Sequence, residues 1–291
     1  MVTTIEHTLN IRPARHGEAI DLAAIWHSAF SSVTDSHGFP RDFSSEEEVV
    51  GLMEHILHLP NAYSAIAESF DGIVGGGFLW VNEEVAGIGP VFVRPEAQGN
   101  QTGRSVMKDL IQRSEQVGQR SVRLTQASFN LVSMSLYAKL GFEIKEPLVV
   151  MEGAPLGIRI PGFEVRPAAM SDSEAMDAMC RRCHGHTRLS DIQHAIEDGT
   201  AKVAISGGRI LGYATDTGFL GHAVAEVNEA LFALLGAAEE FSLSGVMVPT
   251  RNSELLQWCL SAGMRARSPW NLMSRGWYQE PKTPFLPSAL F

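Results

Sequence analysis

A glycine-containing segment, Gln98-Gly99-Asn100-Gln101-Thr102-Gly103-Arg104, follows an apolar run ending at Val93 and precedes a segment with helical periodicity. A strand, a tight turn and a helix N-terminus in this order aim backbone N–H groups and the positive end of a helix dipole at one point. That arrangement suits the binding of phosphate groups. A turn of this kind is also a common structural connection, so the segment alone leaves both interpretations open.

The cysteines offer a second possible chemistry. Cys180-Arg-Arg-Cys183-His184 has the spacing of a haem attachment site, and His186 adds a possible metal ligand. The repeat described below aligns both thiols with positions inside the first helix of the repeated unit, which favours a structural role. The N-terminus also lacks the pattern of an export signal, which haem attachment requires. We therefore expect neither haem nor metal here, nor at His55 and His58, which share one helical face.

The elements that position these residues occur twice. Leu9-Asn-Ile-Arg-Pro-Ala14 matches Phe163-Glu-Val-Arg-Pro-Ala168, and Ile73-Val-Gly-Gly76 matches Ile210-Leu-Gly-Tyr213. Counted from Asn130, the residues Leu136, Tyr137, Gly141, Pro147 and Met151 stand at the same steps as Trp258, Cys259, Gly263, Pro269 and Met273 counted from Asn252. A fixed order of matched landmarks indicates an internal duplication. We call residues 9–152 the first copy and residues 163–276 the second copy.

The second copy is shorter where the glycine-containing loop should be. In the first copy 57 residues separate Ile73 from Asn130, whereas in the second copy 42 separate Ile210 from Asn252, so 15 are missing. The remaining segment, Thr217 to Ala223, contains no counterpart of the loop. Cys259 stands where the first copy has Tyr137, on an apolar helix face, and is expected to be buried and inert. We therefore expect a second copy without catalytic activity that packs on the first.

The pattern of the first copy predicts strands and helices in alternation, which implies a mixed α/β fold with a largely antiparallel sheet flanked by helices. A segment rich in glycine and proline, residues 153–162, separates the copies. We predict two domains, residues 1–156 and 157–291, of which the second is shortened. The expected elements of the first copy are 9–14, 17–30, 45–58, a hairpin over 63–93, 103–117, 121–126, 130–140 and 142–152.

Composition excludes several classes of protein. The chain has 291 residues, 45% of them hydrophobic, and its formal net charge of −10 argues against nonspecific binding to nucleic acid. Without a candidate membrane span or a disulfide framework, a soluble cytoplasmic protein is expected, with a homodimer as an open possibility. The acidic balance would suit an amine partner, but only weakly.

The segment Val93-Arg-Pro-Glu-Ala-Gln-Gly-Asn-Gln-Thr-Gly-Arg104 resembles the acyl-CoA signature of the GNAT superfamily, with Gln101 in the place of the first glycine of its Gly-x-Gly step. Asn130, Ser133, Leu136, Tyr137, Gly141 and Phe142 resemble the next segment of that family. Together these motifs cover residues 91–142. The resemblance implies a tandem acyl-CoA-dependent N-acyltransferase that transfers an acyl group, usually acetyl, to an amine.

The same resemblance assigns roles to residues. It implies that the strand Gly89 to Val93 splays from the next strand and that its free N–H groups hold the acyl-CoA and polarise the thioester carbonyl. It also implies that Tyr137 protonates the thiolate leaving group. Pro90 fits such an interrupted ladder. The implied cofactor-binding residues are Val91, Phe92, Val93, Gln98, Gly99, Asn100, Gln101, Thr102, Gly103, Arg104, Asn130 and Tyr137. Tyr137 could instead be only a core aromatic at helical spacing.

Other roles stay open at this stage. Glu84, beside Glu83 in a predicted hairpin turn, is the candidate general base, although a charged hairpin tip is usually only solvated, and an ordered water is the alternative. Substrate contacts are expected from Ser31 to Phe43, where Asp35, His37 and Asp42 could meet a cationic amine. The leading hypothesis is an acetyl-CoA-dependent N-acetyltransferase acting on a small-molecule or peptide amine. Its rival is a GNAT fold that only binds acyl-CoA, or nothing, and serves regulation.

Overall fold

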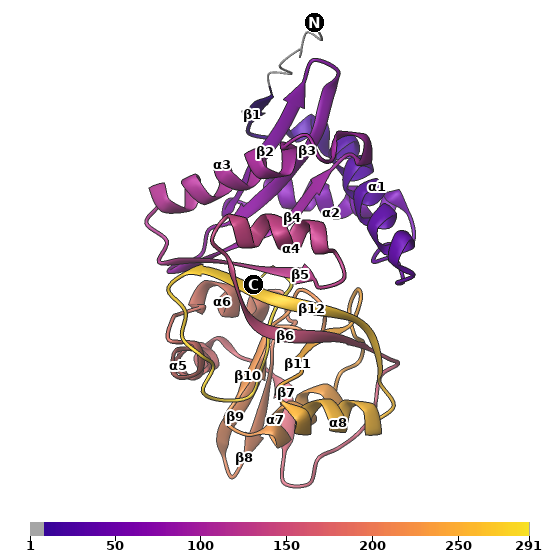
Figure 1. Cartoon of the computed structure of the whole chain (residues 1–291). Coiled ribbons are helices and arrows are strands. Elements are labelled where there is room, and N and C mark those ends of the chain that lie inside the picture. The colour runs from indigo at the N-terminus through magenta and orange to yellow at the C-terminus, as the bar shows by residue number, and fades with distance from the viewer. Residues whose placement is uncertain (1–8, 291) are drawn as a thin grey trace, which may run out of the picture. The chain divides into compact units, whose positions relative to one another are not determined.

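A computed structural model describes residues 9–290 of the chain (Figure 1). Its contacts define two compact units. Unit 1 comprises the chain up to Val81 and Ala86–Val122, and unit 2 comprises Asn82–Val85 and everything from Arg123 onward. The predicted division between residues 156 and 157 marks the boundary of the sequence repeat and lies within unit 2. Among the helices of residues 9–290, none has the length and apolar character needed to cross a lipid bilayer.

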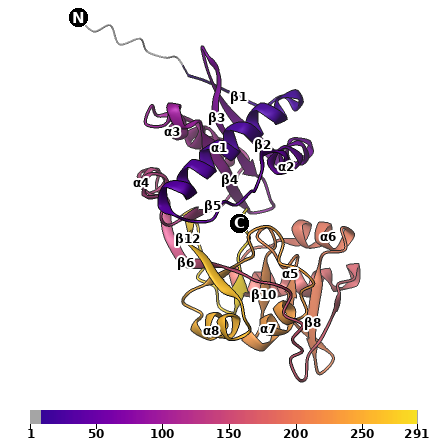
Figure 2. The same ribbon diagram turned by 90° about the vertical axis from the view of Figure 1, so that its right-hand side faces the viewer.

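Unit 1 carries a sheet in the order β1-β2-β3-β4, with antiparallel pairing throughout. Its two faces are covered by different helices, of which α3 lies in front of the strands in Figure 1 and α1 in Figure 2. Gly77 of β3 lies against Val106 and Leu110 of α3, whereas Phe92 of β4 stacks on Trp26 of α1. The elements are β1 (Asn10–Arg12), α1 (Ala19–His37), α2 (Glu46–His58), β2 (Ala62–Ser69), β3 (Gly72–Trp80), β4 (Val85–Val93), α3 (Thr102–Gln116) and β5 (Ser121–Ala127), whose last residues belong to unit 2.

Unit 2 holds the rest of the first copy and all of the second. It contains a five-stranded antiparallel sheet in the order β13-β10-β9-β8-β7 and a second set of strands in the order β5-β12-β6-β11. The elements are α4 (Leu131–Lys139), β6 (Glu143–Glu152), β7 (Glu164–Pro167), α5 (Ser173–His184), α6 (Leu189–Glu197), β8 (Lys202–Ser206), β9 (Arg209–Ala214), β10 (Ala223–Ala225), α7 (Asn228–Gly236), β11 (Val246–Pro249), α8 (Ser253–Ser261), β12 (Arg265–Gly276) and β13 (Phe285–Leu286).

The last strands of the two copies are exchanged. β12 of the second copy lies between β5 and β6 of the first, and β6 in turn lies between β12 and β11 (Figure 1). The exchange buries apolar side chains of both copies together, namely Leu148 and Val150 from β6 with Trp270 and Leu272 from β12. Each copy therefore contributes a strand to the sheet of the other.

Matching interactions confirm the internal duplication. Arg12 contacts Glu18 at 2.6 Å in the first copy, and Arg166 contacts Asp172 at 2.7 Å in the second. The side chain of Asn130 accepts a hydrogen bond from Ser133 N at 3.1 Å, and that of Asn252 accepts one from Leu255 N at the same distance. The elements follow one order in both copies, from β1 and β7 to β6 and β12. The mixed, largely antiparallel α/β fold with a shortened second copy is thus confirmed.

The first helix is longer than the sequence pattern predicted. α1 was expected over residues 17–30, but it continues to His37 and ends at Gly38, which adopts a left-handed conformation at φ 71°. The Thr34 hydroxyl donates to the carbonyl of Phe30, so its hydrogen-bonding requirement is met within the helix. Serine and threonine favour turns by offering such bonds to the backbone, and here the bond is compatible with the helix. The expected variable region from Ser31 therefore begins inside α1.

Candidate functional site

β4 contains a bulge that changes how its edge is used. Gly77 of β3 pairs with Val91 and Leu79 pairs with Ile88, so two residues, Gly89 and Pro90, stand opposite one on β3. Pro90 thus lies at a bulge against the preceding strand, because proline cannot donate to a ladder and is accommodated at bulges. The separation predicted from the next strand stays a prediction. The Gly89–Pro90 peptide is cis, and the Trp80 indole donates to the Gly89 carbonyl at 2.5 Å.

Beyond the bulge, alternate amides of β4 point away from β3. The Arg94 N–H donates to the Val74 carbonyl at 2.8 Å, which fixes the phase of the antiparallel ladder. In such a ladder every second residue directs its N–H and carbonyl to the opposite edge. The N–H groups of Val91 and Val93 therefore face that opposite edge. A strand edge of this kind can receive an extended ligand through main-chain hydrogen bonds.

The predicted phosphate-binding loop connects β4 to α3. Gln98 holds the loop in place by donating from its amide to the Val93 carbonyl at 3.2 Å. Gly99 has φ 81° and Gln101 has φ 64°, so a residue other than glycine adopts the left-handed conformation at position 101. Within residues 9–290 the structure shows no acceptor for the backbone N–H groups of residues 99–104. These amides, with the N-terminal dipole of α3, can bind an anion.

Tyr137 lies on α4 and is buried, with its ring 6.2 Å from that of Phe142. Burial raises the pKa of its phenol to about 12, because the phenolate is disfavoured away from water. The side chain therefore carries its proton throughout the physiological range. A protonated phenol can act as a hydrogen-bond donor or a general acid.

Two polar residues that the sequence analysis missed hold the start of α4. Gln126 of β5 donates from its side-chain amide to the carbonyl of Asn130 at 2.8 Å. Asn271 of β12 donates to the Gln126 side-chain oxygen at 3.1 Å, and both side chains are buried. The second copy thus helps to fix the helix that carries Tyr137. Each of these strands contains one amide residue, and the sequence gives no sign that the two side chains meet.

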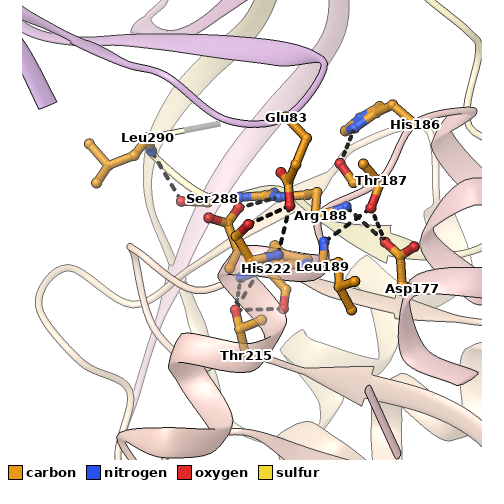
Figure 3. Close-up of polar contacts among 12 residues, drawn as sticks. Glu83, Asp177, His186, Thr187, Arg188, Leu189, Thr215, His222, Ser288 and Leu290 are labelled. Atoms are coloured by element: carbon orange, nitrogen blue, oxygen red, sulfur yellow. Dashed lines mark hydrogen bonds and ion pairs between the residues drawn. The ribbon is translucent and has the colours of Figure 1, made fainter. Parts of the chain in front are cut away.

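The tip between β3 and β4 is not merely solvated. Glu83 accepts hydrogen bonds from the backbone and hydroxyl of Ser190, at 2.7 and 2.6 Å. Glu84 accepts from the Thr187 N–H at 3.4 Å and lies 3.7 Å from the guanidinium of Arg181. Figure 3 shows Glu83 directed toward the segment that carries Thr187, Arg188 and Leu189. Both carboxylates therefore bind the second copy, which the sequence did not reveal because their partners lie about a hundred residues away.

The expected substrate-contact residues in the first copy are partly engaged. Asp35 forms an ion pair with Arg41 at 2.5 Å, which lowers the pKa of its carboxyl group. The ring of His37 lies 2.8 Å from the Val33 carbonyl. The Asp35 carboxylate thus already has a cationic partner.

The cysteines of the second copy are buried. Cys180 and Cys183 lie on α5 and Cys259 on α8, and burial raises the pKa of Cys180 and of Cys259 to about 12. Such thiols remain protonated and are poor nucleophiles and poor metal ligands. Across residues 9–290, no group of three or more histidine, cysteine, aspartate or glutamate side chains is arranged to hold a metal ion.

The predicted site residues are divided between the two units. Unit 1 contains Val91, Phe92 and Val93 on β4 and the residues from Gln98 to Arg104 at the start of α3. Unit 2 contains Asn130 and Tyr137 on α4, together with Glu84. Within each unit, neighbouring residues in the sequence form one local feature. In unit 1 it is a strand edge that β3 does not use, followed by an amide-rich loop, and in unit 2 it is a capped helix with a buried phenol.

Solved structures share this fold along the whole chain. A putative acetyltransferase from Pyrococcus horikoshii superposes with a TM-score of 0.73 at 18% identity, covering 100% of this chain and 97% of that one. A GCN5-related N-acetyltransferase from Sphaerobacter thermophilus gives 0.61 at 16%, covering 94% and 96%. A tandem GNAT protein from the clavulanic acid biosynthesis pathway gives 0.57 at 12%, covering 92% and 98%. No curated protein matches the sequence.

The duplicated fold is therefore that of the tandem GNAT proteins. The sequence agrees, because residues 26–142 match the model of the acetyltransferase (GNAT) family, a span that includes the β4 edge, the loop and Tyr137. The match to the GNAT family model thus covers residues 26–142, and the likeness along the rest of the chain is one of fold.

Proposed function

We propose that this chain transfers an acetyl group from acetyl-CoA to a primary amine of a small molecule or peptide. The observation that carries the proposal is the edge of β4, where Val91 and Val93 present N–H groups that β3 does not use. The unpaired amides of residues 99–104 follow directly and suit a pyrophosphate. An extended arm on the strand edge and a pyrophosphate on the loop match the two ends of an acyl-CoA molecule.

The proposed reaction is a direct transfer. The neutral amine attacks the thioester carbonyl, a C–N bond forms, the C–S bond breaks and the amine loses a proton. A β4 amide stabilises the negative charge that develops on the carbonyl oxygen. Tyr137 gives its proton to the departing thiolate, and its burial keeps that proton available. Glu84, directly or through a water, accepts the proton of the amine.

Binding and turnover separate this proposal from its rival. We would titrate the full chain with acetyl-CoA by calorimetry and then follow thiol release with a panel of small amines and peptide N-termini. Binding with release on any amine supports the transferase. Absence of binding would overturn it. Binding without turnover on any amine would favour a regulatory acyl-CoA-binding module, which the engagement of Glu84 by Thr187 and Arg181 also favours.

A matched pair of variants tests the role of Tyr137. Tyr137→Phe should lower turnover by about a hundredfold, the lower end of general acid catalysis, and leave acetyl-CoA affinity nearly unchanged. Cys259→Ser changes the equivalent position of the second copy and should leave turnover unchanged. Equal turnover in Tyr137→Phe and the parent chain would remove Tyr137 from the mechanism.

A further inference from the structure

The register of the two hairpins relates each residue of β10 to a residue of β4. In the first copy Gly75 pairs with Val93 and Gly77 with Val91. In the second copy Gly212, which aligns with Gly75 in the repeat, pairs with Ala225. Ala225 therefore corresponds to Val93, and Ala223 to Val91.

In each copy, a hydrogen bond one residue beyond these pairs shows which N–H groups of the strand point toward its hairpin partner and which point away. Arg94 N–H donates to the Val74 carbonyl at 2.8 Å, and Glu226 N–H donates to the Leu211 carbonyl at 2.8 Å. The N–H of Ala225 must then point away from β9, as that of Val93 points away from β3. The edge of β10 is thus the counterpart of the edge to which we assigned acyl-CoA.

In the second copy this edge is already occupied. β13, in the C-terminal tail, pairs antiparallel with β10, with Ala223 opposite Leu286 and Val224 opposite Phe285. The outward N–H of Ala225 donates to the Pro284 carbonyl at 2.9 Å. On its other side β13 contacts β11, which is the counterpart of β5. The tail thus lies between the second copy's equivalents of β4 and β5.

The side chains of the tail fill the space on both sides of this strand. Phe285 packs with Met176, Met179 and Cys183 of α5, whereas Leu286 packs with the opposite cluster, which includes Val246 of β11. Alternate residues of a strand face opposite sides of a sheet, so two consecutive apolar residues fill both. Both are 6% exposed.

Polar contacts anchor the tail beyond β13. The Ser288 hydroxyl donates to the Leu220 carbonyl at 2.7 Å and accepts from the Leu290 N–H at 3.1 Å, the latter visible in Figure 3. The Ala289 N–H donates to the Phe219 carbonyl, and its carbonyl accepts from the Thr125 hydroxyl of β5 at 2.8 Å. The tail therefore forms hydrogen bonds with residues of both copies.

We propose that Pro284–Leu290 permanently occupies, in the second copy, the strand edge that acyl-CoA uses in the first. This inference takes the ligand of the first edge from the proposed function. The tail supplies a main-chain acceptor and apolar side chains where an acyl-CoA would supply its arm. The second copy also lacks a phosphate loop, because only Glu226 and Val227 connect β10 to α7. Within residues 9–290, the proposal therefore leaves one acyl-CoA site, in the first copy.

The test removes the tail after folding. A protease recognition sequence is inserted after the exposed Lys282, the full chain is purified and cut, and amide hydrogen exchange is followed at Ala223 and Ala225, whose N–H groups face the tail. Before removal these amides should be protected. When the cut tail is displaced by dilution or mild denaturant, their protection should fall by about tenfold or more, and a synthetic peptide of residues 283–291 should restore it.

Controls keep the outcome interpretable. A peptide carrying Phe285→Asp and Leu286→Asp should neither bind nor protect. Should the inserted chain fail to fold, Ser288→Ala in the uninserted chain should raise exchange at Ala225 while β8 exchanges as before. Unchanged exchange at Ala223 and Ala225 without the tail would overturn the proposal. Acetyl-CoA is absent from these steps, so a failed acetyl-CoA titration would reject the proposed function alone.

Discussion

Equivalent strand edges of the two copies have different partners. In β4 the outward amides of Val91 and Val93 are followed by a loop of unpaired N–H groups. In β10 the matching amide of Ala225 is bonded to Pro284, and the loop is absent. One duplicated unit can therefore hold a ligand or bury its own chain, depending on the segment between two strands. Under the proposed function, acyl-CoA binding and structural support are divided between the copies, while the fold is shared.

Separating the copies is the strongest way to break the comparison. A chain of residues 1–156 lacks β12, so β5 and β6 lose the strand between them and the burial of Leu148 and Val150 against Trp270. Burial of one such side chain stabilises by about 1.5–3 kcal/mol, against a typical total of about 5–15 kcal/mol. We expect no soluble folded monomer by size exclusion and circular dichroism, and recovery on coexpression with residues 157–291. A folded monomer of 1–156 that binds acetyl-CoA would contradict the exchange.

The pH profile tests the protonated phenol of the first copy. In the proposed mechanism Tyr137 acts as a neutral acid, and burial raises its pKa to about 12, so this form is lost only as the pH approaches that value. For an alkylamine acceptor with a pKa near ~10.4, kcat/KM should rise about tenfold per pH unit as the neutral amine forms. Initial rates from pH 6 to 10 should show no descending limb. A fall within that range that disappears in Tyr137→Phe would show a lower pKa.

The helix caps distinguish catalysis from stability. Asn130→Ala and Asn252→Ala remove equivalent bonds, and each should cost about 1 kcal/mol in urea unfolding. Only the first should also lower turnover, by about fivefold, because α4 carries Tyr137. Loss of turnover in Asn252→Ala at full folding would place the second copy in the catalytic step.

The smallest effect is expected at Gln101. A left-handed residue other than glycine costs about 1–2 kcal/mol, and Gln101→Gly removes that cost, offset in part by a more flexible unfolded chain. Stability should rise by less than about 1 kcal/mol, and calorimetry should show acetyl-CoA binding tighter by fivefold or less. Gly99→Ala, also at positive φ, should act in the opposite direction. Weaker binding in Gln101→Gly would assign the glutamine side chain a direct contact.

Local sequence patterns made much of the secondary structure and of the candidate site predictable. The spacing from Asn130 and Asn252 identified both capped helices, and the glycines with Pro90 identified the bulge and the loop. The partners of strands were not predictable in this way. β6 and β12 carry the same landmarks, Pro147 and Pro269, so their sequences do not say which copy each completes. Contacts of Glu84 and the short β13 likewise depend on segments brought together only by folding.

The exchanged strand also sets an order of events during synthesis. β5 and β6 leave the ribosome more than a hundred residues before β12, the strand that must enter between them. At about 5–20 residues per second, the nascent first copy waits on the order of ten seconds with two unpaired strand edges. Such edges attract other extended chains. Folding of the proposed acyl-CoA domain therefore depends on translation of the second copy. Chaperones would act during this interval.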